Sequence, residues 1–151
     1  MISKKKIVIA VIFIFILSFC SYMFWPMTLN SIIFHGEPVF ISFIENKVDN
    51  GVTSQTSYDY VFEYDSDEYR QLFDILDKYP YHRGLYSFTG DISIPKAGRT
   101  VTLYSSGNLI VLGCIPKIIV NEKAYRLGYF NKEIQTNIID EICNLLPEKS
   151  V

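Results

Sequence analysis

The chain has 151 residues, 49% of them hydrophobic, and a formal net charge of −2. All sixteen acidic residues follow Pro26 against eleven lysines and arginines, which gives residues 27–151 a formal charge of −5 and argues against nucleic acid as a partner. That stretch has the length of one domain that buries a core of its own.

The N-terminus predicts a membrane anchor. Three lysines, Lys4–Lys6, precede nineteen residues without a formal charge, Ile7–Trp25, and Pro26 then stops the helix. At about 1.5 Å per residue such a helix spans roughly 28 Å, close to the ~30 Å hydrocarbon core of a bilayer. Because the lysines come first, the positive-inside rule places the N-terminus in the cytoplasm. We therefore expect residues 1–26 to form a single-pass signal-anchor and residues 27–151 to form an extracytoplasmic domain.

Two other interpretations of the N-terminal segment stay open. A bacterial lipoprotein would be acylated at Cys20, where Leu17 and Ser18 stand in suitable places but Phe19 replaces the usual small residue. A cleaved secretory signal has a shorter apolar region and small residues at its cleavage site. All three interpretations deliver residues 27–151 to the same side of the membrane.

The first part of the domain predicts a hairpin. Met27–Phe34 is either an interfacial continuation of the anchor or the first packed segment of the domain. Apolar and alternating patterns predict strands over Val39–Ile44 and Tyr58–Tyr64. Glu45–Ser57 between them is polar and contains the turn dipeptide Asn50-Gly51, so we expect it to connect the two strands.

A helix and a long loop are expected next. Asp65–Lys78 has the apolar spacing of a helix, with its first residue as N-cap and Glu68 as the partner in a capping box. Pro80–Gly98 contains three glycines and two prolines. This composition predicts a surface loop with at most one short strand, at Asp91–Ile94.

Four further strands and a last helix complete the chain. The strands are expected over Arg99–Tyr104, Leu109–Cys114, Lys117–Val120 and Ala124–Phe130. Asn131 is expected to cap the helix, and Pro147 ends it. Its predicted buried stripe is Ile134, Ile138, Ile142, Leu145 and Leu146. The order β-β-α-β-β-β-β-α predicts an α+β domain in which two helices cover one face of an antiparallel sheet.

The lysine-rich tip, the single apolar helix and the segment Lys123–Phe130 before a terminal helix form one architecture. In this respect the chain resembles small uncharacterised membrane-anchored envelope proteins of Gram-positive bacteria. The resemblance covers the chain as architecture, implies a place in the cell envelope, and implies no catalytic residue.

The sequence predicts no catalytic residue, metal site or cofactor. It has no Gly-x-Ser-x-Gly elbow and no phosphate-binding glycine loop. His35 and His82 are 47 residues apart and lack a His or Cys at metal-ligand spacing. The acidic run 59–68 lacks the glycine and the spacing of a calcium loop, so we expect a solvated face. Cys114 and Cys143 are expected as buried thiols, although this compartment permits a disulfide.

Aromatic residues are the most suggestive feature. Seven of the eleven tyrosines lie within residues 58–86. In the expected loop, three tyrosines surround a histidine and an arginine: Tyr79, Tyr81, His82, Arg83 and Tyr86. Tyrosine combines a large contact area with a polar tip, which suits recognition of proteins or sugars. We therefore predict a membrane-anchored binding or accessory protein of the cell envelope, with these five residues as binding surface and another envelope protein or a glycan as partner.

An envelope hydrolase is the alternative. It would use scattered Asp and His side chains around residues 80–98. Such an enzyme requires a concave pocket that brings at least two of Asp59, His82 and Asp91 within hydrogen-bonding reach of each other.

Overall fold

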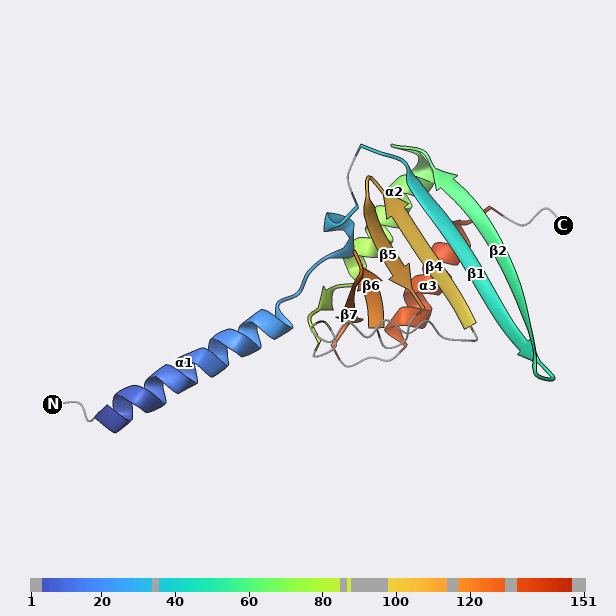
Figure 1. Cartoon of the computed structure of the whole chain (residues 1–151). Coiled ribbons are helices and arrows are strands. Elements are labelled where there is room, and N and C mark those ends of the chain that lie inside the picture. The colour runs from blue at the N-terminus through green and yellow to red at the C-terminus, as the bar shows by residue number, and fades with distance from the viewer. Residues whose placement is uncertain are drawn as a thin grey trace.

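A computed structural model describes residues 4–33, 36–84, 87, 98–113, 117–129 and 133–147. The chain is an α+β protein, as the sequence predicts: helices cover one face of a seven-stranded antiparallel sheet, and an apolar helix extends away from it (Figure 1). The sheet order is β2-β1-β4-β5-β6-β7-β3. The elements are α1 (Lys4–Phe24), η1 (Leu29–Ser31), β1 (Val39–Asp49), β2 (Val52–Phe62), α2 (Asp67–Lys78), β3 (Tyr81–His82), β4 (Gly98–Ser105), β5 (Asn108–Leu112), β6 (Lys117–Val120), β7 (Lys123–Leu127) and α3 (Ile134–Leu145).

The hairpin of β1 and β2 is longer than predicted. Asn50 and Gly51 both adopt positive φ, at 48° and 80°, and form a two-residue turn of the kind that joins antiparallel strands. Pairing then runs without interruption from Asp49↔Val52 to Val39↔Phe62. The expectation that Glu45–Ser57 is a connection is therefore wrong. The turn fixes the register, and the polar residues beside it pair as strands whose two faces are both solvated.

The core lies between the sheet and the helices α2 and α3. The predicted apolar stripes of both helices are confirmed, because Leu72, Leu76, Ile138 and Ile142 are fully buried. Alternate residues of the sheet meet them from the other side, as the strand period of two requires. Val111 and Ile119 form a second, smaller cluster of buried residues, separate from this core, and Leu109 packs against it.

The N-cap of α2 is Ser66, one residue later than predicted. Its side-chain oxygen accepts a hydrogen bond from the backbone N–H of Tyr69 at 3.1 Å. Asp65 adopts a positive φ of 66°, whereas an N-cap needs the extended backbone that Ser66 has. The Asp65 carboxylate instead binds Arg70, which also reaches Asp67.

The segment after α1 packs into the domain. Leu29 and Ile33 are buried among the core residues, which supports the first packed segment over an interfacial continuation. The predicted meander is confirmed as β4 to β7, with shifted ends. Several predicted features lie outside the described residues: Phe34, His35, Tyr86, Asp91–Ile94, Cys114, Phe130 and Asn131.

Candidate functional site

The residues predicted as binding surface are mostly buried. Tyr79, Tyr81 and His82 are 9%, 6% and 4% exposed, so the expectation that they lie on a surface loop is wrong. Tyr81 and His82 form β3, which pairs with Leu127 and Arg126 of β7 at the edge of the sheet. A strand of two residues has no sequence pattern of its own, and burial comes from distant segments that cover it. Arg83 is half-buried.

Tyr81, His82 and Arg83 lie at the junction between α1 and the sheet. Met27, just after the helix, exchanges two backbone hydrogen bonds of 2.8 Å with Tyr81. The segment that follows α1 thereby extends the sheet at its β3 edge. Met23, in the last turn of α1, is buried, whereas the rest of the helix is exposed.

Two side chains of the domain satisfy carbonyl groups at the end of α1. The last four carbonyls of a helix lack partners within the helix. The Arg83 guanidinium donates to the carbonyl oxygen of Tyr22 at 3.3 Å and lies 4.1 Å from the centre of its ring. The Tyr129 hydroxyl donates to the carbonyl oxygen of Phe24 at 2.8 Å. A cation is also favourable here because a helix C-terminus carries partial negative charge.

His82 occupies the centre of this junction. Its ring stacks on Tyr129, with centroids 4.6 Å apart, and lies 5.8 Å from the ring of Phe24. Nδ1 is 2.9 Å from the carbonyl oxygen of Arg83, and Nε2 is 2.9 Å from that of Gly128. Both nitrogens face backbone carbonyls, so this ring cannot act as a base or a metal ligand without leaving its position.

Tyr79 connects the two helices of the domain. Its hydroxyl donates a 2.6 Å hydrogen bond to Glu141 on α3, which also pairs with Lys78. Burial, together with this carboxylate, raises the pKa of Tyr79 to about 12. The same hydrogen bond lowers the pKa of Glu141. The contact is thus a structural tie that involves a neutral phenol at physiological pH.

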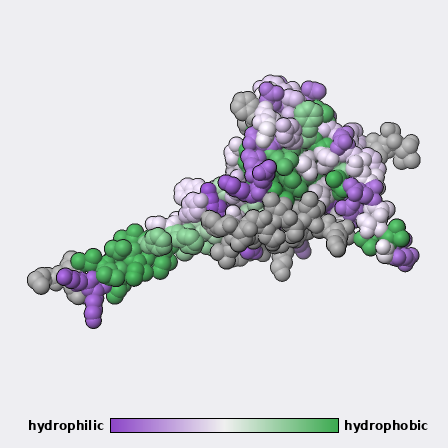
Figure 2. All heavy atoms as spheres, viewed as in Figure 1, coloured by the Kyte–Doolittle hydropathy of each residue, from purple (hydrophilic) through white to green (hydrophobic). Residues whose placement is uncertain are grey.

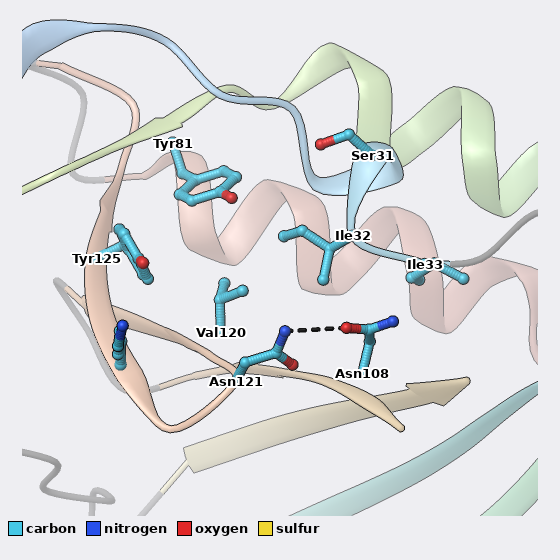
Figure 3. Close-up of a pocket in the computed structure, with 9 residues that line it drawn as sticks. Ser31, Ile32, Ile33, Tyr81, Asn108, Val120, Asn121 and Tyr125 are labelled. Carbon is cyan, nitrogen blue, oxygen red and sulfur yellow. Dashed lines mark hydrogen bonds between the residues drawn. The ribbon is translucent and has the colours of Figure 1, made fainter. Parts of the chain in front are cut away.

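A cavity of about 660 Å³ lies beside Tyr81. Figure 3 shows it between the segment that carries Ser31, the turn that carries Asn121 and the strand that carries Tyr125. Burial raises the pKa of Tyr81 to about 12, so its hydroxyl stays protonated. The wall combines phenols, amides and one ammonium group, Lys123, with apolar side chains. This surface can bind a partner by hydrogen bonds and by apolar contact; the hydroxyl of Ser31, which also lines it, donates to the carbonyl oxygen of Thr28 at 2.7 Å.

Sequence reasoning missed most of this wall. The Asn121 side chain donates to Asn108 at 2.9 Å and accepts from the backbone N–H of Leu109 at 2.8 Å. Both asparagines stand at tight turns, where the sequence indicates only a turn. No signal in the sequence shows that η1 would close one side of a cavity above them.

The hydrolase alternative finds little support in the described residues. Asp59 lies on β2 and His82 on β3, which are the opposite edges of the sheet. Asp91, the third residue it would use, lies outside the described residues. Within the described ranges, no three His, Cys, Asp or Glu side chains are placed so that they could hold a metal ion.

Comparison with known proteins adds no relative to this picture. The chain matches no protein-family model, no curated protein and no solved structure. The site must therefore be interpreted from its own geometry.

Proposed function

We propose that this protein is a single-pass membrane protein whose sheet domain is held at the outer face of the cytoplasmic membrane and acts by binding another envelope component. The lysines Lys4–Lys6 support the orientation, because they precede the apolar helix. The acidic domain supports a protein or glycan partner over nucleic acid.

The observation that carries this proposal is the exposure of α1. The helix has 21 residues and is long and apolar enough to cross a membrane. Only 6% of its apolar stretch is buried within the protein. Figure 2 shows its hydrophobic side chains projecting from the body of the protein. A helix that is apolar on all sides needs either a protein core or lipid around it. At about 1.5 Å per residue it is roughly 32 Å long, which matches a bilayer core.

The junction supports retention of the helix end. Tyr22, Phe24 and Met27 contact the domain through side chains or backbone. A secretory signal that is cleaved away would have no use for such contacts. Acylation at Cys20 would keep them, so the lipoprotein stays the second candidate for the mode of attachment.

A pair of lysines in the helix tests the proposal. Ile14→Lys together with Leu17→Lys should release the full chain from membranes, because each lysine at a helix centre costs about 3 kcal/mol of insertion free energy. Val48→Lys with Val52→Lys, at the exposed hairpin tip, is the matched control and should stay bound. Retention is measured by carbonate extraction. Membrane retention of the helix variant at the level of the control would contradict the proposal.

A second variant separates the two modes of attachment. Cys20→Ser should leave membrane retention and apparent mass unchanged if the helix is the anchor. Release of this variant into the soluble fraction, or an unprocessed form of higher apparent mass than the wild type, would identify a lipoprotein instead.

A further inference from the structure

β2 is an edge strand: its residues are exposed over Val52–Ser57, alternate between half-buried and exposed over Tyr58–Val61, and Phe62 is buried. Among the described residues no strand pairs with that edge, whereas β1 occupies the inner one. β2 has 11 residues, forms an uninterrupted ladder and contains no lysine, arginine, proline or glycine. Proteins protect exposed edges with charged residues, lysine above all, with proline, with bulges or with short strands. β2 is long and unbulged, has neither lysine nor proline, and carries a single charge, Asp59, so its free backbone groups can pair with another chain.

The residues that offer these groups follow from the turn. In a two-residue hairpin the positions that flank the turn form a hydrogen-bonded pair, and the two kinds of pair then alternate. Asp49↔Val52 is the first hydrogen-bonded pair. By this alternation Ile44↔Ser57, Ser42↔Asp59 and Phe40↔Val61 are non-hydrogen-bonded pairs. The N–H and C=O groups of Ser57, Asp59 and Val61 therefore point away from β1.

A groove lies beside the C-terminal end of β2. A cavity of about 330 Å³ is lined by three consecutive residues of β2, Tyr60–Phe62, and by the helix ends that carry Ser66 and Leu145. Because consecutive residues line it, the cavity borders the strand backbone rather than one face of the sheet. A second cavity, of about 440 Å³, adjoins it across Tyr60 and Pro147. A strand laid along the edge would place alternate side chains in this groove.

The charge of the groove selects the occupant. Glu63 and Glu68 line the smaller cavity, and Asp59 precedes Tyr60 on β2. In the described part of the chain none of these three carboxylates forms a salt bridge, whereas Asp65 and Asp67 pair with Arg70. Arg99 lines the larger cavity, where it is paired with Asp140. An approaching segment with lysine or arginine would meet these acidic groups, and one with its own acids would be repelled.

We propose that β2 accepts an extended segment of a partner protein, in which aliphatic and basic residues alternate, as an added strand. The main-chain hydrogen bonds supply affinity and the groove supplies side-chain selectivity. This inference rests on the proposed function, because an envelope partner reaches β2 only if the domain lies outside. Access is favourable, since α1 packs at the β3 edge and β2 is the opposite edge, away from the helix (Figure 1).

A second copy of the chain fits less well than a separate partner. Two-fold pairing through β2 would put the two α1 helices at opposite ends of a doubled sheet. The helices would then extend in opposite directions and could not enter one bilayer. We therefore assign the edge to a different chain.

The test uses the full chain in detergent micelles and a labelled peptide of about seven residues in which valine and lysine alternate, long enough to span roughly 23 Å of strand. Binding is measured by fluorescence anisotropy. We expect saturable binding that weakens about tenfold or more when glutamate replaces lysine in the peptide, because the charges then repel. A similar loss is expected when the peptide amides that face β2 are methylated, because they no longer donate.

Variants of the chain complete the test. Ser57→Pro removes an outward N–H without removing a bond to β1 and should abolish binding, while Ser57→Ala should bind as the wild type does. Glu63→Gln with Glu68→Gln should weaken binding and flatten its salt dependence. Equal binding of the methylated and plain peptides would overturn the proposal. A dimer of the chain that Ser57→Pro dissociates would show a second copy as occupant and would overturn it too. Carbonate extraction tests the membrane anchor and does not involve the peptide. A failure of the proposed membrane attachment can therefore be distinguished from a failure of the proposed peptide binding at β2.

Discussion

Tyr81 is the residue at which sequence and structure differ most, and its truncation gives the sharpest prediction. The side chain is 6% exposed, belongs to the main core cluster and packs edge-on against Tyr125 with centroids 5.1 Å apart. Truncation of a buried aromatic side chain to alanine costs about 3–5 kcal/mol of unfolding free energy. For a domain of this size we expect Tyr81→Ala to lower the melting temperature by about 10 °C or more.

The full chain in micelles is melted by circular dichroism, with two controls. Tyr81→Phe keeps the ring and should cost about 1 kcal/mol or less, since it removes one hydroxyl. Tyr64→Ala truncates a tyrosine that is mostly exposed, so we expect a loss below about 1 kcal/mol. If Tyr81→Ala melted within a few degrees of Tyr64→Ala, the burial of β3 would be refuted.

Two further predictions concern the ties around this strand. Tyr79→Phe removes the hydrogen bond to Glu141 and should cost about 1 kcal/mol at neutral pH. That bond lowers the pKa of Glu141 in the folded state, so its stabilisation is present above the unfolded pKa of the carboxyl and is lost as pH falls through the folded pKa. The free energies of unfolding of the wild type and Tyr79→Phe, measured by chemical denaturation, should therefore converge in acid. A difference that stays constant with pH would contradict this. Arg83→Gln removes the guanidinium from Tyr22, so chymotrypsin should cleave the end of α1 faster in micelles while the melting temperature changes little; unchanged cleavage would show that the contact does not restrain the helix.

Much of the fold could be predicted because its elements carry strong local patterns. The stripe of α2 through Leu72 and Leu76, and the strand Lys117–Val120, appear in the structure where the sequence places them. The Asn50-Gly51 turn was also evident. The length of its hairpin was not, since a strand with two solvated faces shows no alternation of apolar and polar residues.

The expected exposure of Tyr79, Tyr81 and His82 is wrong for a non-local reason. Tyr81 and His82 follow a proline in a stretch rich in glycine, and that composition favours a loop. Their burial depends on Met27 and Gly128, which lie far away in the sequence. Of the side chains that suggested a partner, His82 and Arg83 contact the end of the chain's own apolar helix, and Tyr79 binds Glu141 on α3.

The unprotected edge of β2 could not be predicted either, although the residues that leave it unprotected are visible in the sequence. Edge strands cannot be told from central ones until the sheet order is known. Once β2 is placed at the edge, the absence of lysine and proline from it becomes informative.

Thiol labelling of the full chain in intact cells tests the orientation of the protein most directly. Thr53→Cys places a thiol on the exposed part of β2, and Lys5→Cys places one before the apolar segment. With the domain outside, a membrane-impermeant maleimide should label Thr53→Cys above the wild-type background in intact cells, and Lys5→Cys only after the membrane is permeabilised. Labelling of Lys5→Cys in intact cells, with Thr53→Cys protected, would contradict an outward-facing domain anchored by α1.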